Sequence, residues 1–257
     1  LKISLVGAKR VRTVIRDASG KKVAVRCGSK KAEDGRRIQK LKIRKPKLWT
    51  PETPDLYYAV TSVYKGFKKV DEYTTRFGVR SIELIADKGF FLNGKVRKFQ
   101  GVCNHHDLGP LGSAINVAAL RRQLTMLKEM GCDAIRTSHN MPAPELVKAC
   151  DEMGMMLMAE TFDCWVTPKV QNGYNLYFEE WAEKDLVNLI RHYRNSPAVV
   201  MWCVGNEVPD QWPGDKGAKI ALWLQQICHR EDPTRPVTMG MDQPGSVINN
   251  NVAAVFD

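Results

Sequence analysis

The feature of this sequence that most constrains its fold is an apolar run at residues 199–204, inside the segment AVVMWCVGNEVP. An apolar run of this length between turn residues is typical of a strand buried on both faces, as in parallel sheets covered by helices. Gly205 ends the run, and Asn206 and Glu207 are the first polar residues after it. Barrel enzymes carry catalytic residues at such C-terminal strand tips, because the loops there vary above a packed core. Glu207 is therefore the first candidate for a catalytic carboxylate.

The rest of the second half of the chain alternates between helix and strand patterns. Residues 117–130 and 144–153 have the pattern of amphipathic helices, the first with Asn116 as its cap, and each ends at a Glu-Met-Gly tripeptide. Longer helices are predicted at about 177–195 and 218–229. The predicted strands are 98–102, 134–137, 155–158, 199–204, 236–241 and one that starts at 252–256. This alternation indicates β/α units around a parallel sheet.

The first part of the chain has a different pattern, with short alternating runs separated by polar turns. The predicted strands there are 11–15, 23–25, 41–44, 57–64 and 71–77. Such spacing favours an antiparallel sandwich. We therefore expect an immunoglobulin-like β-sandwich over residues 1–86, followed over residues 87–257 by an incomplete (β/α)8 TIM barrel with about six strands. A closed barrel needs eight strands, and the chain does not begin with Met, so we expect it to be truncated at both ends.

The positive charge of the chain is concentrated in one segment. The net charge is +11, and residues 1–50 hold 17 of the 39 Lys and Arg but only 3 of the 28 Asp and Glu. These basic residues alternate with apolar ones, which favours a solvated sheet face, with a surface for an anionic partner as the alternative. No aromatic residue interrupts this stretch before Trp49, which counts against stacking on nucleic-acid bases.

Several other classes of protein are disfavoured by the sequence. The seven Cys form no CxxC pair, so a zinc site and a disulfide framework are both disfavoured. No stretch approaches the roughly 18 apolar residues that span a bilayer, and no signal-peptide pattern opens the chain. We expect a soluble protein with neither a membrane nor a nucleic-acid partner. The compartment and the oligomeric state stay open, a homo-oligomer included.

Polar side chains follow four successive predicted strands. These strand tips carry Asn-His-His-Asp at 104–107, Arg-Thr-Ser-His-Asn at 136–140, Glu-Thr-Phe-Asp at 160–163 and Asn-Glu at 206–207. Hydrogen-bonding groups around carboxylates, with a Trp nearby for sugar faces, are typical of a carbohydrate site. The candidate site residues are Glu207 as the catalytic residue, with His105, His106, His139, Asn140, Glu160, Asp163, Trp165 and Asn206 as substrate-binding residues.

Six motifs together give the sequence a family resemblance. They are PKLWTPE at 46–52, RFGVR at 76–80, FLNGK at 91–95, Gly-Val at 101–102 before the His pair, RTSHN at 136–140 and GNE at 205–207. On these motifs the chain resembles, over essentially its whole length, glycoside hydrolase family 2, the family of β-galactosidases, β-glucuronidases and β-mannosidases. The string CNHHDLG at 103–109 most resembles members of β-galactosidase type.

The resemblance implies a retaining exo-glycosidase that hydrolyses terminal β-D-galactosides. Glu207 would be the acid/base, Asn206 would hold the sugar 2-hydroxyl, and His139 would contact the sugar or its transition state. Either His105 or His106 would do so too, and the motif does not decide between them. In the family the nucleophilic carboxylate comes from the seventh strand, so we expect it outside this chain and expect the chain alone to be inactive. The alternatives are β-glucuronidase or β-mannosidase specificity, or a non-catalytic remnant that binds carbohydrate or a partner protein.

Two positions depart from the family pattern. Ala159 stands where the family commonly has Asp, and Cys164 stands where metal-dependent members have a carboxylate. A thiol is a poor ligand for Mg2+, which prefers oxygen ligands. We therefore expect no cofactor and no metal site, with Mg2+ disfavoured by Cys164.

Overall fold

The computed structural model describes residues 2–3, 10–31, 36–212 and 214–257. By its internal contacts the chain forms two compact units, Leu1–Val79 and Arg80–Asp257. Within the described ranges, none of the helices has both the length and the apolar character that a membrane span needs.

The first unit consists of two antiparallel sheets, as a sandwich requires. The four-stranded sheet has the order β3 (Lys22–Cys27), β2 (Arg10–Asp17), β6 (Tyr57–Lys65) and β7 (Lys68–Phe77), and the three-stranded sheet has the order β1 (Lys2–Ile3), β5 (Arg37–Ile38) and β4 (Lys30–Lys31). In β2, Val11, Thr13 and Ile15 are buried, whereas Arg10, Arg12 and Arg16 are exposed. The period-2 alternation of basic and apolar residues is therefore that of a strand with one buried face.

The prediction of a strand at residues 41–44 is wrong. Residues 41–43 have no regular secondary structure, and the chain bends at 44–45. Leu41 and Ile43 are nonetheless partly buried against a cluster formed by Ile15, Tyr57 and Ala59. The alternation of apolar and basic residues thus reflects burial of one side of an extended segment, which needs no partner strand.

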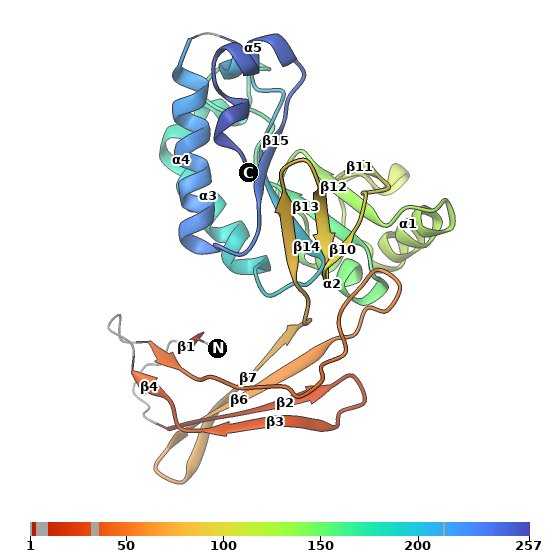
Figure 1. The fold of residues 1–257 in the computed structure, drawn as a ribbon, viewed down its shortest axis with the longest axis vertical. Helices are drawn as coiled ribbons and strands as arrows, with labels where there is room; N and C mark the ends of the chain where they lie inside the picture. Colours follow the sequence, from red (N-terminus) through yellow and green to blue (C-terminus); the bar gives the residue numbers. More distant parts are fainter. Residues whose placement is uncertain (1, 4–9, 32–35, 213) are drawn as a thin grey trace. The chain divides into compact units, whose positions relative to one another are not determined.

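The second unit begins with a small antiparallel sheet and continues as successive β/α units. The small sheet consists of β8 (Ile82–Ile85), β9 (Gly89–Leu92) and β10 (Lys95–Val96). The parallel sheet contains β11 (Gly101–His105), β12 (Ala134–Ser138), β13 (Met156–Glu160), β14 (Val199–Asn206) and β15 (Val237–Gly240), side by side in chain order (Figure 1). The helices between these strands are α1 (Val117–Glu129), α2 (Pro144–Met153), α3 (Phe178–Tyr193) and α4 (Lys216–Glu231), and α5 (Pro244–Asn249) follows β15. Parallel strands in chain order, each followed by a helix, are the arrangement of a TIM barrel.

Local sequence signals set the helix boundaries. Asn116 caps α1, because its side-chain oxygen accepts the N–H of Ala119 at 3.0 Å. Leu120 and Leu124 are the buried face of that helix. Gly154 ends α2 in the left-handed region with φ 72°, a conformation that glycine adopts without strain. These predictions from the sequence are confirmed.

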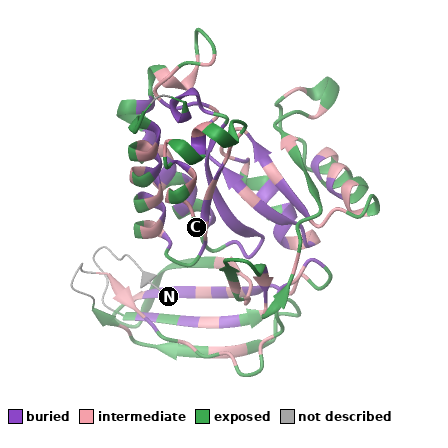
Figure 2. Ribbon diagram, turned by 45° about the horizontal axis from the view of Figure 1, so that its top comes forward, coloured by how far each residue is buried: buried purple, intermediate pink, exposed green. Residues whose placement is uncertain are grey.

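Strand β14 is buried along its whole length, as Figure 2 shows for most of the parallel sheet. Its N-terminal end is held by two arginines, since Arg80 and Arg235 both donate to the carbonyl oxygen of Val199, at 2.5 and 2.7 Å. Because the strand is fixed at one end and packed on both faces, its C-terminal tip has a defined position. That tip carries Asn206 and Glu207.

The sixth strand expected to start at 252–256 is absent from the described part of the chain, which has five parallel strands. A 3-10 turn, η4 (Ala253–Val255), stands at this position, and Val252 is buried beside it. Pairing with β15 is made by Asp257, whose N–H donates to the Val237 carbonyl at 3.3 Å and whose carboxylate accepts the Val237 N–H at 2.8 Å. The apolar residues at 252–256 therefore fill the turn that leads to this contact.

Candidate active site

The carboxyl ends of neighbouring parallel strands bring the predicted polar residues to one edge of the sheet. In the register, His105 pairs with Ser138, Glu160 with Cys203 and Asn206 with Gly240. Residues that lie far apart in the sequence are thus brought together at the tips of β11 to β15. The edge therefore forms a single candidate site.

Glu160, the last residue of β13, is the buried carboxylate of the site. Its side chain is 0% exposed, and one oxygen lies 2.6 Å from Nε of Arg136. The other oxygen lies 3.0 Å from Nδ1 of His139. Burial raises the pKa of the Glu160 carboxyl above its ordinary value, while the adjacent guanidinium opposes the rise. Glu160 is thus held on both oxygens and is closed to solvent.

Arg136 links this buried carboxylate to the tip of β14. Its NH2 group donates to Oδ1 of Asn206 at 3.0 Å. The space for this contact depends on Gly240 in β15, because a Cβ there would lie 2.6 Å from that NH2 group and 3.0 Å from Asn206 Oδ1. The sequence placed Arg136 in a motif but gave it no role. The signal available in the sequence was a cationic residue in one strand-tip motif and a carboxylate, Glu160, at the tip of the next strand.

Asn206 is bound through both ends of its amide. Besides the bond from Arg136, its Nδ2 donates to Oδ1 of Asp163 at 3.2 Å. The same Asp163 oxygen accepts from Nζ of Lys169 at 3.0 Å. These contacts fix the side chain with its nitrogen toward Asp163 and leave one amide hydrogen for another acceptor. Lys169, in the loop after β13, is a second residue that sequence reasoning did not single out.

Glu207 follows directly and differs from Glu160 in its surroundings. The residue is exposed, and its backbone lies in the left-handed region with φ 45°. Its N–H donates to the carbonyl of Gly240 at 2.8 Å. A non-glycine residue held in this conformation is uncommon and costs free energy, and such residues are enriched at active sites. The backbone of Glu207 is therefore fixed while its carboxylate stays open to solvent.

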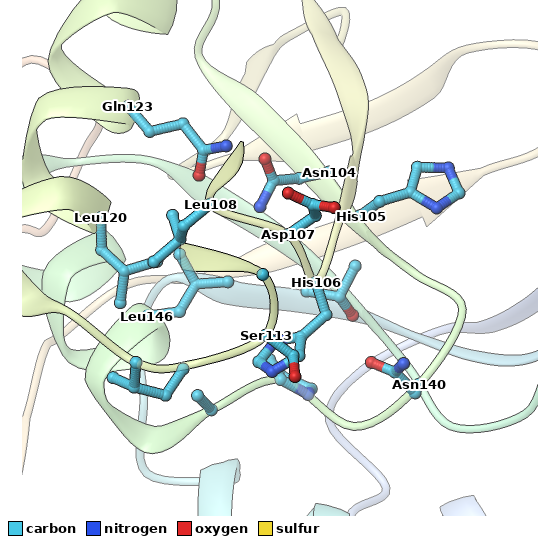
Figure 3. A pocket seen from close by; sticks show the side chains of 15 residues that line it. Asn104, His105, His106, Asp107, Leu108, Ser113, Leu120, Gln123, Asn140 and Leu146 are labelled. Carbon is cyan, nitrogen blue, oxygen red and sulfur yellow. The ribbon is translucent and has the colours of Figure 1, made fainter. Parts of the chain in front are cut away.

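The two neighbouring histidines of β11 and its loop point in different directions. The ring of His105 packs edge-on against that of His139, with 5.2 Å between centroids and an interplanar angle of 83°. His106 extends toward Ser113 in a small hollow, and His105, which also lines this hollow, extends in a different direction (Figure 3). That hollow is also lined by Asn140, which is exposed. His105 is thus the one of the pair that lies beside His139.

The surroundings of His139 favour the neutral form of its imidazole. Burial lowers the pKa of its imidazole, and the charges of Arg136, His105 and Lys169 lower it further, against the opposing effect of Asp163. Because Nδ1 faces Glu160, the other ring nitrogen remains for a ligand. A neutral imidazole can accept or donate one hydrogen bond there.

Trp165 and Cys164 lie inside the protein. The indole of Trp165 is 0% exposed and donates to the carbonyl of Val204 at 2.7 Å. A Cβ on Gly205 would lie 3.0 Å from its ring. Trp165 therefore supports β14 from beneath and presents no face to a sugar.

The thiol of Cys164 does not suit Mg2+. Cys164 is 2% exposed and ends in a soft thiol, whereas Mg2+ binds hard oxygen ligands. Across the described ranges no three His, Cys, Asp or Glu side chains are grouped closely enough to hold a metal ion.

Comparison with known proteins agrees with this geometry. Residues 83–256 match the model of the glycosyl hydrolases family 2 TIM barrel domain, and residues 6–80 match a further glycosyl hydrolases family 2 domain. A solved family 2 glycosyl hydrolase from Bacteroides cellulosilyticus superposes with a TM-score of 0.90 at 32% identity, over 98% of this chain and 33% of that one.

Two curated relatives carry different names. A β-galactosidase of Bacteroides ovatus is 42% identical, over 90% of this chain and 31% of its own length. A putative β-glucuronidase of Formosa agariphila is 37% identical, over 88% of this chain and 21% of its own length. The chain thus spans about a third or less of the length of these relatives. The family resemblance expected from the motifs and the sandwich-plus-barrel fold are confirmed, and the chain belongs to glycosyl hydrolases family 2.

Proposed function

We propose that this site acts in a retaining glycosidase that hydrolyses terminal β-D-galactosides, with Glu207 as the acid/base. The observation that carries the proposal is the state of Glu207. It is an exposed carboxylate on a fixed, strained turn at a strand tip, directly after an asparagine whose amide is bound at both ends.

The chemistry requires a proton donor at this position. A glycosidic oxygen is a poor leaving group until it is protonated, and the same carboxylate later removes a proton from the attacking water. Asn206 would donate its remaining amide hydrogen to the 2-hydroxyl of the sugar. The free ring nitrogen of His139 would contact another hydroxyl, and the edge-on ring of His105 would complete that side of the site.

Retention also requires a nucleophilic carboxylate, roughly 5 Å from the acid/base. Glu160 is ill suited to this role, because it is fully buried and both of its oxygens are engaged by Arg136 and His139. We assign Glu160 a positioning role, and we place the nucleophile outside these 257 residues. The chain alone would then be inactive.

The choice of sugar rests on the relatives. The β-galactosidase has the higher identity of the two reported, which favours a neutral β-D-galactoside. Relatives named as β-glucuronidases, at 37% and 33% identity, make a β-glucuronide the second candidate. A glucuronide differs by a carboxylate, which would need a cationic or hydrogen-bonding partner in the site.

The test is hydrolysis by the full-length protein of nitrophenyl β-D-galactoside and nitrophenyl β-D-glucuronide, with the first-formed sugar anomer followed by proton NMR. We expect faster hydrolysis of the galactoside, with the β-anomer appearing first. Faster hydrolysis of the glucuronide would replace the substrate with the second candidate. The α-anomer appearing first would contradict the retaining mechanism, and hydrolysis of neither glycoside would favour a binding role.

A further inference from the structure

Lys169 makes contacts that ordinary loop anchoring does not require. Its Nζ lies 3.0 Å from Oδ1 of Asp163 and 2.6 Å from the main-chain oxygen of Asn206. The side chain of Lys169 is 22% exposed, so most of it is buried. Charge-assisted hydrogen bonds of this length are among the stronger ones in proteins.

The second of these contacts reaches the peptide bond between Asn206 and Glu207. The carbonyl of that peptide accepts from Lys169, and its N–H donates to the carbonyl of Gly240 at 2.8 Å. The peptide is therefore held on one side by the loop after β13 and on the other side by the end of β15. This is the peptide that enters the left-handed conformation of Glu207 at φ 45°, a conformation that persists only where the surroundings fix it.

The first contact acts on the side chain of the same asparagine. Lys169 and Asn206 donate to one and the same oxygen of Asp163, at 3.0 and 3.2 Å. The ammonium thus holds the carboxylate that orients the Asn206 amide. The ammonium of Lys169 therefore contacts the backbone that leads into Glu207 and, through Asp163, orients the side-chain amide of Asn206.

Resting on the function proposed above, we propose that Lys169 is a positioning residue that fixes the Asn206–Glu207 turn for proton donation and for binding of the sugar 2-hydroxyl. It contacts neither the substrate nor the reacting atoms. The plain alternative is an ion pair with Asp163 that merely anchors the loop after β13.

The same loop offers a matched control. Thr167 anchors it to Asp210, with its N–H donating at 3.0 Å and its hydroxyl at 2.9 Å, and among the described residues these bonds lead to Asp210 and not to Asn206 or Glu207. If Lys169 only anchors the loop, Thr167→Val should have the same kind of effect as Lys169→Met.

The experiment compares kcat/KM of the full-length enzyme, of Lys169→Met, Lys169→Arg and Thr167→Val, and of Glu207→Gln as the reference. The substrates are phenyl galactoside, with a poor leaving group, dinitrophenyl galactoside, with a good one, and 2-deoxy dinitrophenyl galactoside. We expect Lys169→Met to lose about 10²-fold on the phenyl galactoside, at the lower end of what acid catalysis contributes. On the dinitrophenyl galactoside it should lose far less, and its penalty for removal of the 2-hydroxyl should shrink. Lys169→Arg should recover part of the loss, and Thr167→Val should keep the wild-type ratios.

The outcomes separate this inference from the proposed function. An equal loss by Lys169→Met on all three substrates, with a clear leaving-group effect in Glu207→Gln, would overturn the role of Lys169 and leave the proposed function standing. No leaving-group effect in Glu207→Gln would overturn the acid/base assignment and this inference with it. Should Lys169→Met fail to fold, Lys169→Gln, whose uncharged amide can still donate hydrogen bonds, is compared by the same ratios.

Discussion

The two glutamates at the strand tips of the parallel sheet are held in opposite ways. Glu160 on β13 is fixed through its side chain, by Arg136 at 2.6 Å and His139 at 3.0 Å, and it is closed to solvent. Glu207 after β14 is fixed through its backbone, and its side chain is exposed. A carboxylate that must exchange protons with a substrate needs access, whereas one that organises its neighbours needs fixed partners. Under the function proposed above, burial and strong pairing mark Glu160 as the supporting carboxylate, and solvent access marks Glu207 as the reacting one.

The largest expected effect follows from removing the partner of the buried carboxylate. Arg136→Met leaves Glu160 buried without its counter-charge, which should lower the free energy of unfolding by about 3–5 kcal/mol. Arg121→Met is the control, because its pair with Glu152 is partly exposed, at 44% and 28%, and such pairs contribute about 0–1 kcal/mol. Urea denaturation followed by tryptophan fluorescence measures both. Equal losses would show that Glu160 is not held as a buried ion pair.

The pH dependence of the unfolding free energy of Arg136→Met tests the same pairing of Glu160 with Arg136. Burial already raises the pKa of Glu160 from its ordinary value of 4.5, and loss of Arg136 removes the effect that opposes the rise. The folded variant then binds more protons than the unfolded one above pH 4.5, so its stability falls as pH increases. The pKa of Glu160 in the folded wild type is about 8, so the deficit of Arg136→Met should grow mainly as the pH rises above that value.

A smaller effect is expected from a substitution beside Arg136, which contacts both Glu160 and Asn206, the residue before Glu207. In Gly240→Ala the new Cβ would lie 2.6 Å from the NH2 group of Arg136 and 3.0 Å from Asn206 Oδ1. Overpacking of this kind typically costs about 1–3 kcal/mol, and displacement of Asn206 should lower kcat/KM as well. Gly245→Ala is the matched control, since no atom lies within 4 Å of its added Cβ. Wild-type kcat/KM in Gly240→Ala would mean that the Arg136–Asn206 bond does not position the site.

The smallest expected effect concerns His139. Its pKa is lowered from 6.5 by burial and by the charge of Arg136, so the folded protein binds fewer protons than the unfolded chain at mildly acidic pH. The stability that this provides is present above pH 6.5 and is lost as pH falls through the pKa of the folded state. Wild type should therefore lose more stability than His139→Asn when unfolding is measured at decreasing pH. A parallel decline of the two proteins would show that His139 is not held neutral.

Sequence patterns predicted the elements that obey simple periodicity. The cap at Asn116, the stop at Gly154 and the buried run of β14 are each confirmed, because each depends on residues close in sequence. The failures lie at 41–44 and 252–256, where apolar residues are buried without joining a strand. Hydrophobic periodicity predicts which residues are buried. Whether a segment becomes a strand also depends on a neighbouring strand to pair with, and the local sequence does not specify that neighbour.

The site was predictable by its strand tips and not by its internal contacts. The tips placed Glu160 and Asn206 at one edge, since parallel strands share their direction. Which histidine lies beside His139 depends on the direction in which His105 leaves its strand, and the sequence does not contain that direction. Lys169 lies six residues after Asp163 in an irregular loop, so no repeat pattern relates its ammonium to either partner. Trp165 is an aromatic residue of the kind that stacks on sugar faces, but its side chain is buried against Gly205.

The most direct test of the division between the two glutamates is rescue by azide in the full-length enzyme. Turnover of dinitrophenyl galactoside is measured for Glu207→Gln and Glu160→Gln with increasing sodium azide, and the products are identified by NMR. Azide attacks a glycosyl-enzyme without needing a general base. We expect azide to accelerate Glu207→Gln with release of β-galactosyl azide, and to leave Glu160→Gln unaffected, because that variant keeps its base. Acceleration of Glu160→Gln together with no response of Glu207→Gln would contradict the account, since it would make the buried glutamate the reacting one.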